Sequence, residues 1–109
     1  MEQHWLTQAE GAYRRALALE EGSATSRLAL ARVLTARARL ALSAAAEAPM
    51  LQEAEILTRA VLAAAPTTEA EQGLAEILFH QRRWADLRRA CHDAVAAGRA
   101  NDLLAWWAA

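Results

Sequence analysis

The side chains with the greatest chemical reactivity are a lone cysteine, Cys91, the histidine that follows it, His92, and two further histidines, His4 and His80. A metal ion or a nucleophilic pair needs such groups to converge on one point, whereas adjacent residues of a helix point about 100° apart. Cys91 also falls on an apolar helical stripe, and neither His4 nor His80 completes a ligand spacing with it. We therefore expect Cys91 to be a small core residue, and we expect no metal site and no cofactor.

The rest of the sequence carries no catalytic motif. It contains no glycine-rich phosphate loop, no Ser-His-Asp set and no pair of carboxylates in a context that would form a pocket. These observations predict a protein that is not an enzyme.

The charged residues argue against nucleic acid as a partner. All 12 basic residues are arginine, 13 residues are acidic, and the net charge is −1. The arginine pairs at 14–15, 82–83 and 88–89 are interspersed with Glu and Asp and have no aromatic residues between them, so we interpret them as solvated helix faces. The absence of lysine and the abundance of alanine indicate a GC-rich coding bias, most often bacterial, with arginine-rich recognition as the minority interpretation.

Length and composition indicate one small domain. The chain has 109 residues, 55% of them apolar, and alanine dominates the apolar set, which favours close packing of helices through small side chains. A single cysteine cannot form an internal disulfide, and the start MEQHWLTQ does not resemble a signal peptide. The apolar run at Leu40–Ala46 is too short to span a bilayer. We expect a soluble, cytoplasmic protein with no membrane contact.

Apolar residues recur at helical spacing in the first half of the chain. They predict a helix over about His4–Glu20, whose inward stripe is Leu6, Ala9, Ala12, Tyr13, Ala16 and Leu17. Ser23 can cap a long second helix through residues 24–48. Pro49 is expected to end that helix and to open a third over Met50–Ala64.

The second half predicts two more helices and a short last one. Thr68 and Glu71 fit a capping box that opens a helix to about Gln81. After a turn at Arg82-Arg83, the next helix has its expected inward face at Trp84, Leu87, Ala90, Cys91, Ala94 and Val95. Gly98 is expected to cap this helix, and a short helix follows over residues 101–109.

Small residues in these helices recur at a fixed interval. Ala60 and Ala94 stand in similar settings, TRAV and HDAV, 34 positions apart. Other positions follow the same pattern: Leu74-Ala75, Leu78, Phe79, Trp84, Leu87 and Cys91 in the second half, Leu30, Ala31, Leu34 and Leu57 before them, and Ala9, Tyr13 and Ala16 at the start. In this pattern the chain resembles the tetratricopeptide repeat (TPR) family, although Ala16 and Ala60 are 44 positions apart.

The resemblance implies an all-α fold of antiparallel helix-turn-helix pairs. These pairs would stack as a short TPR-like right-handed solenoid of about five helices plus a short C-terminal helix. The units would be a half-repeat at 4–22, repeats at 23–66 and 67–100, and a C-terminal half-repeat helix at 101–109. An ordinary α-helical bundle is the alternative.

Repeat domains of this family bind peptides or partner helices on a concave face lined by first helices. Carried onto this chain, that face would be lined by Leu28, Arg32, Thr35, Ala36 and Arg39 from one helix and by Gln72, Glu76, Phe79 and His80 from another. Arg32 and Arg39 would hold acidic side chains or a C-terminal carboxylate, and Phe79 would add apolar contact. Alternatively, the two arginines pair with Glu69 or Glu76 on the neighbouring helix.

The C-terminal segment is rich in large apolar residues. Leu103, Leu104, Trp106 and Trp107 would lie on more than one side of a short helix. They would either fold back or form a contact with another copy of the chain, and the second favours a homo-oligomer. We thus expect a non-enzymatic module that binds a protein or peptide of acidic character. The alternatives are a self-assembly domain and a regulatory or recruiting domain of a larger enzyme or transcription regulator.

Overall fold

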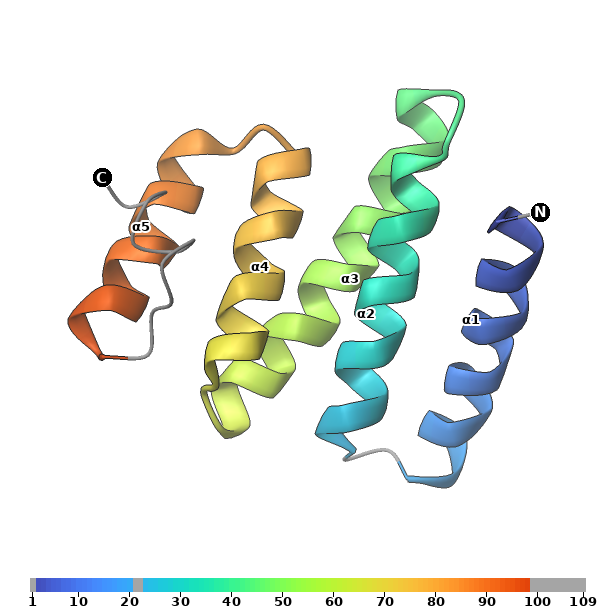
Figure 1. Cartoon of the computed structure of the whole chain (residues 1–109), viewed down its shortest axis with the longest axis horizontal. Helices are drawn as coiled ribbons and strands as arrows, with labels where there is room; N and C mark the ends of the chain where they lie inside the picture. The colour runs from blue at the N-terminus through green and yellow to red at the C-terminus, as the bar shows by residue number, and fades with distance from the viewer. Residues whose placement is uncertain (1, 21–22, 99–109) are drawn as a thin grey trace.

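A computed structural model describes residues 2–20 and 23–98, and this part of the chain consists of helices and their connections, without a strand. The helices are α1 (Glu2–Leu19), α2 (Ala24–Arg39), α3 (Ala44–Ala64), α4 (Thr68–His80) and α5 (Trp84–Ala96). Figure 1 shows them arranged side by side from α1 to α5, with α3 crossing behind α2 toward α4. The all-α prediction is confirmed. The half-repeat helix predicted at 101–109 lies outside the described residues.

The boundary between the second and third helices differs from the prediction. Helix α2 ends at Arg39, and α3 begins at Ala44, so the long helix over 24–48 was wrong. The Ser43 hydroxyl caps α3 by accepting a hydrogen bond from the Ala46 amide at 3.2 Å, and the alanines that follow have the highest helix propensity. Pro49 lies inside α3, where its missing N–H removes one helical hydrogen bond that the cap and the alanines offset.

The other helix ends follow the expected chemistry more closely. The Ser23 hydroxyl caps α2 by accepting from the Ser26 amide at 3.1 Å, and Gly98 has a φ of +75°, as expected of a glycine after a helix. The cap of α4 is Thr67, whose hydroxyl accepts from the Ala70 amide at 3.1 Å. The capping box predicted at Thr68 and Glu71 was therefore wrong by one residue.

Two clusters of buried residues form the core. One joins α2, α3 and α4 through Leu30, Ala31, Leu34, Ala38, Leu51, Ala54 and Ile77. The other joins α4 and α5 through Leu74, Ala75, Leu78, Leu87, Cys91 and Ala94. Five of these thirteen residues are alanine, whose small side chains allow helices to approach closely.

Two residues of α5 predicted to point inward are exposed. Trp84 is 55% exposed and Val95 is 42% exposed. At about 100° per residue both lie roughly 60–80° to the same side of Leu87, whereas Cys91 and Ala94 lie within about 40° of it. The buried stripe of α5 is therefore narrower than the apolar pattern suggested, because α4 covers only its centre.

Helix α1 is attached by partly buried apolar side chains, such as Leu17 against the core, and by ion pairs. None of its described side chains is buried, and Ala12 and Tyr13, predicted to point inward, are exposed because α2 covers only one side of α1. Glu10 pairs with Arg37 of α2 and with Arg14, and Arg14 donates two hydrogen bonds of 2.8 Å to Glu53 of α3. These ion pairs connect α1 to both α2 and α3.

A second ion-pair cluster ties α3 to the turn between α4 and α5. Glu55 accepts hydrogen bonds from Arg59 at 2.8 Å and from Arg83 at 2.7 Å, and Arg83 also pairs with Asp86. Burial alone would raise the pKa of Glu55, but the Arg59 hydrogen bond, the Arg83 charge and a hydrogen bond from Gln81 together lower it below its ordinary value. This cluster fixes the position of the α4–α5 turn.

Candidate functional site

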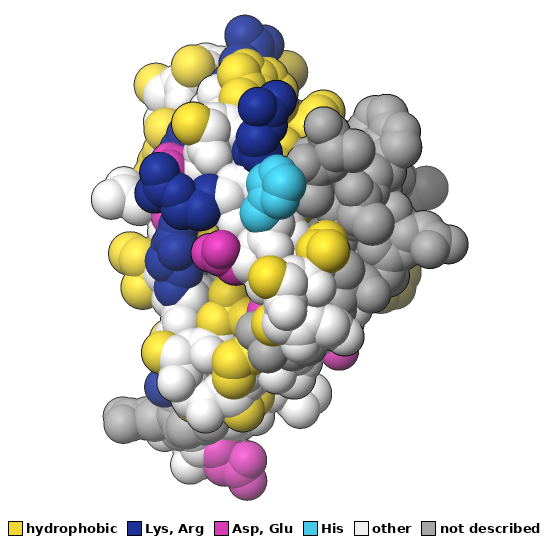
Figure 2. All heavy atoms as spheres, turned by 90° about the vertical axis from the view of Figure 1, so that its left-hand side faces the viewer, with side chains coloured by type: hydrophobic (Ala, Val, Ile, Leu, Met, Phe, Trp, Pro, Cys, Tyr) yellow, Lys and Arg dark blue, Asp and Glu magenta, His cyan; other side chains and the backbone are white. Residues whose placement is uncertain are grey.

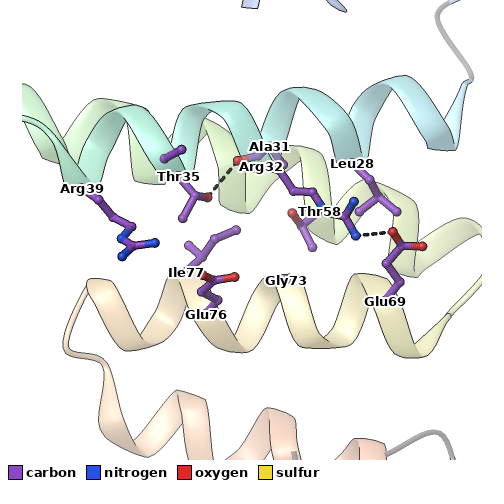
Figure 3. Close-up of a pocket in the computed structure, with 11 residues that line it drawn as sticks. Leu28, Ala31, Arg32, Thr35, Arg39, Thr58, Glu69, Gly73, Glu76 and Ile77 are labelled. Carbon is purple, nitrogen blue, oxygen red and sulfur yellow. Dashed lines mark hydrogen bonds and ion pairs between the residues drawn. The ribbon is translucent and has the colours of Figure 1, made fainter. Parts of the chain in front are cut away.

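A groove lies between α2 and α4, which are far apart in sequence but adjacent in space (Figure 3). Its volume is about 190 Å³. The residues that line it come from α2, α3 and α4: Leu28, Ala31, Arg32, Thr35, Ala36, Arg39, Thr58, Glu69, Gly73, Glu76 and Ile77. The buried side chains of Ala31 and Ile77 form part of its floor, and the charged side chains stand along its sides.

Six residues of the predicted face meet in this groove: Leu28, Arg32, Thr35, Ala36 and Arg39 from α2, and Glu76 from α4. Gln72 does not line it. Gln72 and Phe79 are seven residues apart and share a face that lies about 80–100° around α4 from the groove-lining face. His80 is the last residue of α4, and it lines a different hollow together with Phe79.

The two ends of the groove differ in charge balance. Arg32 donates a hydrogen bond to Glu69 across the groove. At this end the structure therefore contains the internal ion pair that was the alternative to binding a ligand carboxylate. At the other end, neither Arg39 nor Glu76 forms an ion pair with any residue that the structure describes. Both side chains point into the space between the helices (Figure 3). A charge without an internal counterion can be satisfied by a ligand at little cost in desolvation.

The hydroxyl groups of the groove are bonded to their own helices. The Thr35 hydroxyl donates to the Ala31 carbonyl, and the Thr58 hydroxyl donates to the Ala54 carbonyl, both at 2.8 Å. Each hydroxyl oxygen can still accept a hydrogen bond from a ligand, but its proton is already donated to the backbone carbonyl. These threonines therefore contribute acceptors and shape to the groove, and the arginines supply its donors.

Gly73 is a groove residue that the sequence did not point to. A Cβ built on Gly73 meets nothing within 4 Å, so the groove is open at this position. Glycine inside a helix costs about 1 kcal/mol relative to alanine, and its place in the middle of α4 was the available signal. Its lack of a side chain leaves room for a ligand to approach the α4 backbone.

No protein-family model, curated protein or solved structure matches the chain.

A second hollow, which we call the end cleft, lies where α3 begins and α4 turns into α5. Its volume is about 880 Å³. Its lining residues are Ala38, Arg39, Ala44, Glu47, Ala48, Leu51, Phe79, His80, Gln81, Arg82 and Trp84. Arg39 lines both the groove and the end cleft, so the two hollows meet at the C-terminal end of α2.

Of the reactive side chains considered first, Cys91, His92 and His4 lie apart from both hollows, whereas His80 lines the end cleft. Cys91 is fully buried in the cluster between α4 and α5, as predicted, and burial raises the pKa of its thiol. His92 is exposed on α5, and His4 is exposed on α1. Within residues 2–20 and 23–98, no group of three or more His, Cys, Asp or Glu side chains is placed to hold a metal ion.

No helix in the described part of the chain is both long enough and apolar enough to cross a membrane. The predicted contact residues Leu103, Leu104, Trp106 and Trp107 lie outside the described residues, so their role stays a prediction.

Proposed function

We propose that this chain is a non-enzymatic protein-binding module, a short TPR-like repeat domain that takes a peptide or partner segment in the groove between α2 and α4. The observation that carries the proposal is the open end of the groove, where Arg39 has no ion-pair partner among the described residues and faces the ligand space. The ligand supplies a carboxylate, from an acidic side chain or a chain terminus, to this guanidinium.

The neighbour relations of the helices support repeat stacking over an ordinary bundle. Helices α2 and α3 form one hairpin, and α4 and α5 form the next. Helix α4 contacts both α3 and α2, so the first helix of one pair packs against both helices of the pair before it. Repeat domains bury a continuous core in this way and present their first helices side by side.

The groove also has features that select a ligand. Glu76 places a negative charge near Arg39, so a carboxylate followed by a donor group fits better than a run of acidic residues. The internal Arg32–Glu69 pair closes the other end without leaving a net charge there. Gly73, between these ends, accommodates the ligand backbone.

The test uses peptides selected from a random 12-residue library displayed on phage, synthesised and measured by fluorescence anisotropy. Arg39→Ala should weaken a groove-bound peptide about tenfold, because a charge-assisted hydrogen bond is lost. Gly73→Leu should fill the groove and abolish binding while the helix becomes no less stable. Arg15→Ala, an exposed arginine of α1 without an ion pair in the described chain, is the control. If every selected peptide bound Gly73→Leu as tightly as wild type, the groove would be contradicted.

Self-assembly is the second candidate, and the outermost described helices favour it. Helix α1 exposes Trp5 and Leu19, and α5 exposes Trp84 and Val95, so large apolar residues face solvent at both ends of the row. Sedimentation velocity over a hundredfold concentration range separates the candidates. A mass that rises with concentration, without any selected peptide, would assign these faces to copies of the chain.

A further inference from the structure

The end cleft combines an apolar floor with an exposed aromatic wall. Leu51 and Ala38 form buried parts of the floor. Phe79 and Trp84 line one side, with ring centroids 5.4 Å apart and ring planes at 73°, an edge-to-face pair. The cleft is distinct from the groove, because Thr58, Glu69 and Gly73 do not line it.

The aromatic pair is held in place but left partly in water. Phe79 is 43% exposed and Trp84 is 55% exposed, although both rings contact each other. Trp84 is the first residue of α5, directly after a turn that the Glu55–Arg83 ion pair fixes. Aromatic side chains that are rigidly held and half exposed lose little entropy on binding, which makes them effective anchors for a partner.

The rim of the cleft is basic. Arg39, Arg82 and His80 line it against one acidic residue, Glu47. Arg39 and Arg82 form no ion pair within the described chain, whereas Arg83, next to Arg82, pairs with both Glu55 and Asp86. On the face that α5 presents, basic side chains gather in the upper half among hydrophobic ones (Figure 2). A partner of negative charge complements this rim.

The backbone conformation at Arg82 allows a substitution that removes the charge without straining the turn. Arg82 has a φ of +59°, in the left-handed region that glycine adopts freely and other residues adopt at a cost. The turn geometry alone would favour glycine, so what arginine adds at this position is its guanidinium. Replacing it with glycine removes the charge and relieves the backbone at the same time.

We infer that the end cleft is a second docking surface, for a partner segment in which an aromatic or leucine side chain stands beside acidic residues. The apolar side chain packs against Phe79 and Trp84 above the Leu51 floor. The carboxylates accept hydrogen bonds from Arg82 and Arg39. This surface does not depend on a ligand in the α2–α4 groove.

The experiment selects peptides from the same random 12-residue phage library on the full chain, then measures capped, fluorescein-labelled peptides by anisotropy. Enriched peptides should carry an aromatic residue or leucine next to at least two acidic residues. Trp84→Ala should weaken them about tenfold, the usual loss at an aromatic anchor. Arg82→Gly should weaken them about threefold, and less so at high salt, since salt screens the exposed charge.

Two controls distinguish a loss of binding from a loss of folding. Arg82→Gly should unfold at the same temperature as wild type or a higher one, so lost binding cannot come from lost structure. Trp5→Ala removes an exposed tryptophan of α1 that does not line the cleft, and it should leave the affinity within about twofold.

The outcomes separate the two surfaces. Peptides whose affinity is lowered by Trp84→Ala and preserved by Gly73→Leu support the end cleft. If every enriched peptide shows the reverse pattern, the groove stands and the end cleft is overturned. Failure to enrich acidic apolar peptides also overturns it. Self-association of the chain through Trp84, without binding of any peptide, would also overturn the proposal, because the end cleft would then hold a second copy of the chain.

Discussion

Replacing Arg14 with methionine should loosen α1 from the molecule while α2 to α5 stay packed. The substitution keeps the apolar stem of the side chain and removes the guanidinium, which donates two hydrogen bonds of 2.8 Å to Glu53 and one of 2.9 Å to Glu10. Glu10 keeps its pair with Arg37, so one ionic link between α1 and α2 survives. The attachment that is lost is therefore the Arg14–Glu53 link, because the Arg14–Glu10 pair joins two residues of α1 itself.

The size of the effect follows from the exposure of the pair. The side chains of Arg14 and Glu53 are 44% and 40% exposed, so solvent screens them and each link is worth about 0.2–1 kcal/mol. The bidentate geometry places the Arg14–Glu53 link in the upper part of that range. The Arg14–Glu10 pair lies within α1 and does not hold the helix in place, so the lost Arg14–Glu53 link alone gives up to about 1 kcal/mol, which is roughly a fivefold larger population of molecules in which α1 is detached.

Hydrogen exchange measured by NMR resolves this local opening. The amides of α1 should exchange about fivefold faster in Arg14→Met, and those of α4 and α5 should keep their rates, because α1 is attached without a fully buried side chain. Arg15→Met, a neighbouring arginine without an ion pair in the described residues, should change neither set. Equal acceleration in all helices would refute the local opening, and unchanged α1 rates would refute the role of Arg14.

The pKa of Glu53 gives an independent measure of the same contact. The hydrogen bond from Arg14 lowers the pKa of Glu53 below its ordinary value of 4.5, against the opposing effect of burial. A lowered pKa in the folded state adds stability above pH 4.5 that is lost as the pH falls through the folded value. In Arg14→Met the pKa of Glu53 should return toward 4.5, and a side-chain carboxyl titration by NMR detects this.

Three further predictions concern other parts of the chain. Glu55→Gln should lower the free energy of unfolding by about 1 kcal/mol at pH 7. The difference from wild type should shrink as the pH falls below 4.5, because the pKa of Glu55 is lowered in the folded state, and urea unfolding at pH 7 and pH 3.5 checks both effects. Gly73→Ala should raise the melting temperature, since an alanine Cβ meets nothing within 4 Å and improves helix propensity by about 0.5–1 kcal/mol; an unchanged or lower temperature would mean that the position is more crowded than the structure shows. Deleting Leu103–Ala109 should lower the mass measured by light scattering, or lower solubility, if these residues form an intermolecular contact; a monomer of unchanged mass and stability would argue against that role.

The helix pattern of the sequence predicted the fold class well but placed one boundary badly. Periodicity located the buried residues Leu30, Leu34, Leu87 and Cys91, because burial on one face leaves a direct trace in the spacing of apolar residues. The α2–α3 boundary depended on a competition between two signals, the Ser43 cap and the Pro49 break. The sequence alone does not determine which signal sets the boundary. In the structure α3 begins after the Ser43 cap, because the alanines that follow the cap favour a helix.

The site was predictable only where helical spacing determines it. Arg32, Thr35 and Arg39 share one face of α2 by their spacing, so their meeting in a groove could be expected once α2 was placed beside α4. The contribution of Gly73 depends on how closely α4 approaches α2, and the exposure of Trp84 depends on how much of α5 is covered. Both are properties of packing between helices, which a single sequence does not specify.

Arg39 is the residue at which the two proposed surfaces meet, and this has a physical consequence for both. It lines the groove, the end cleft and a third hollow beside Trp5, so ligands in the groove and in the end cleft would draw on the same five N–H donors. A groove ligand and an end-cleft ligand would therefore compete for it, even though their other contacts are separate. The coupling is expected to be weak, because Arg82 remains available to the end cleft. By linkage, a ligand on either surface should weaken binding at the other by the same factor.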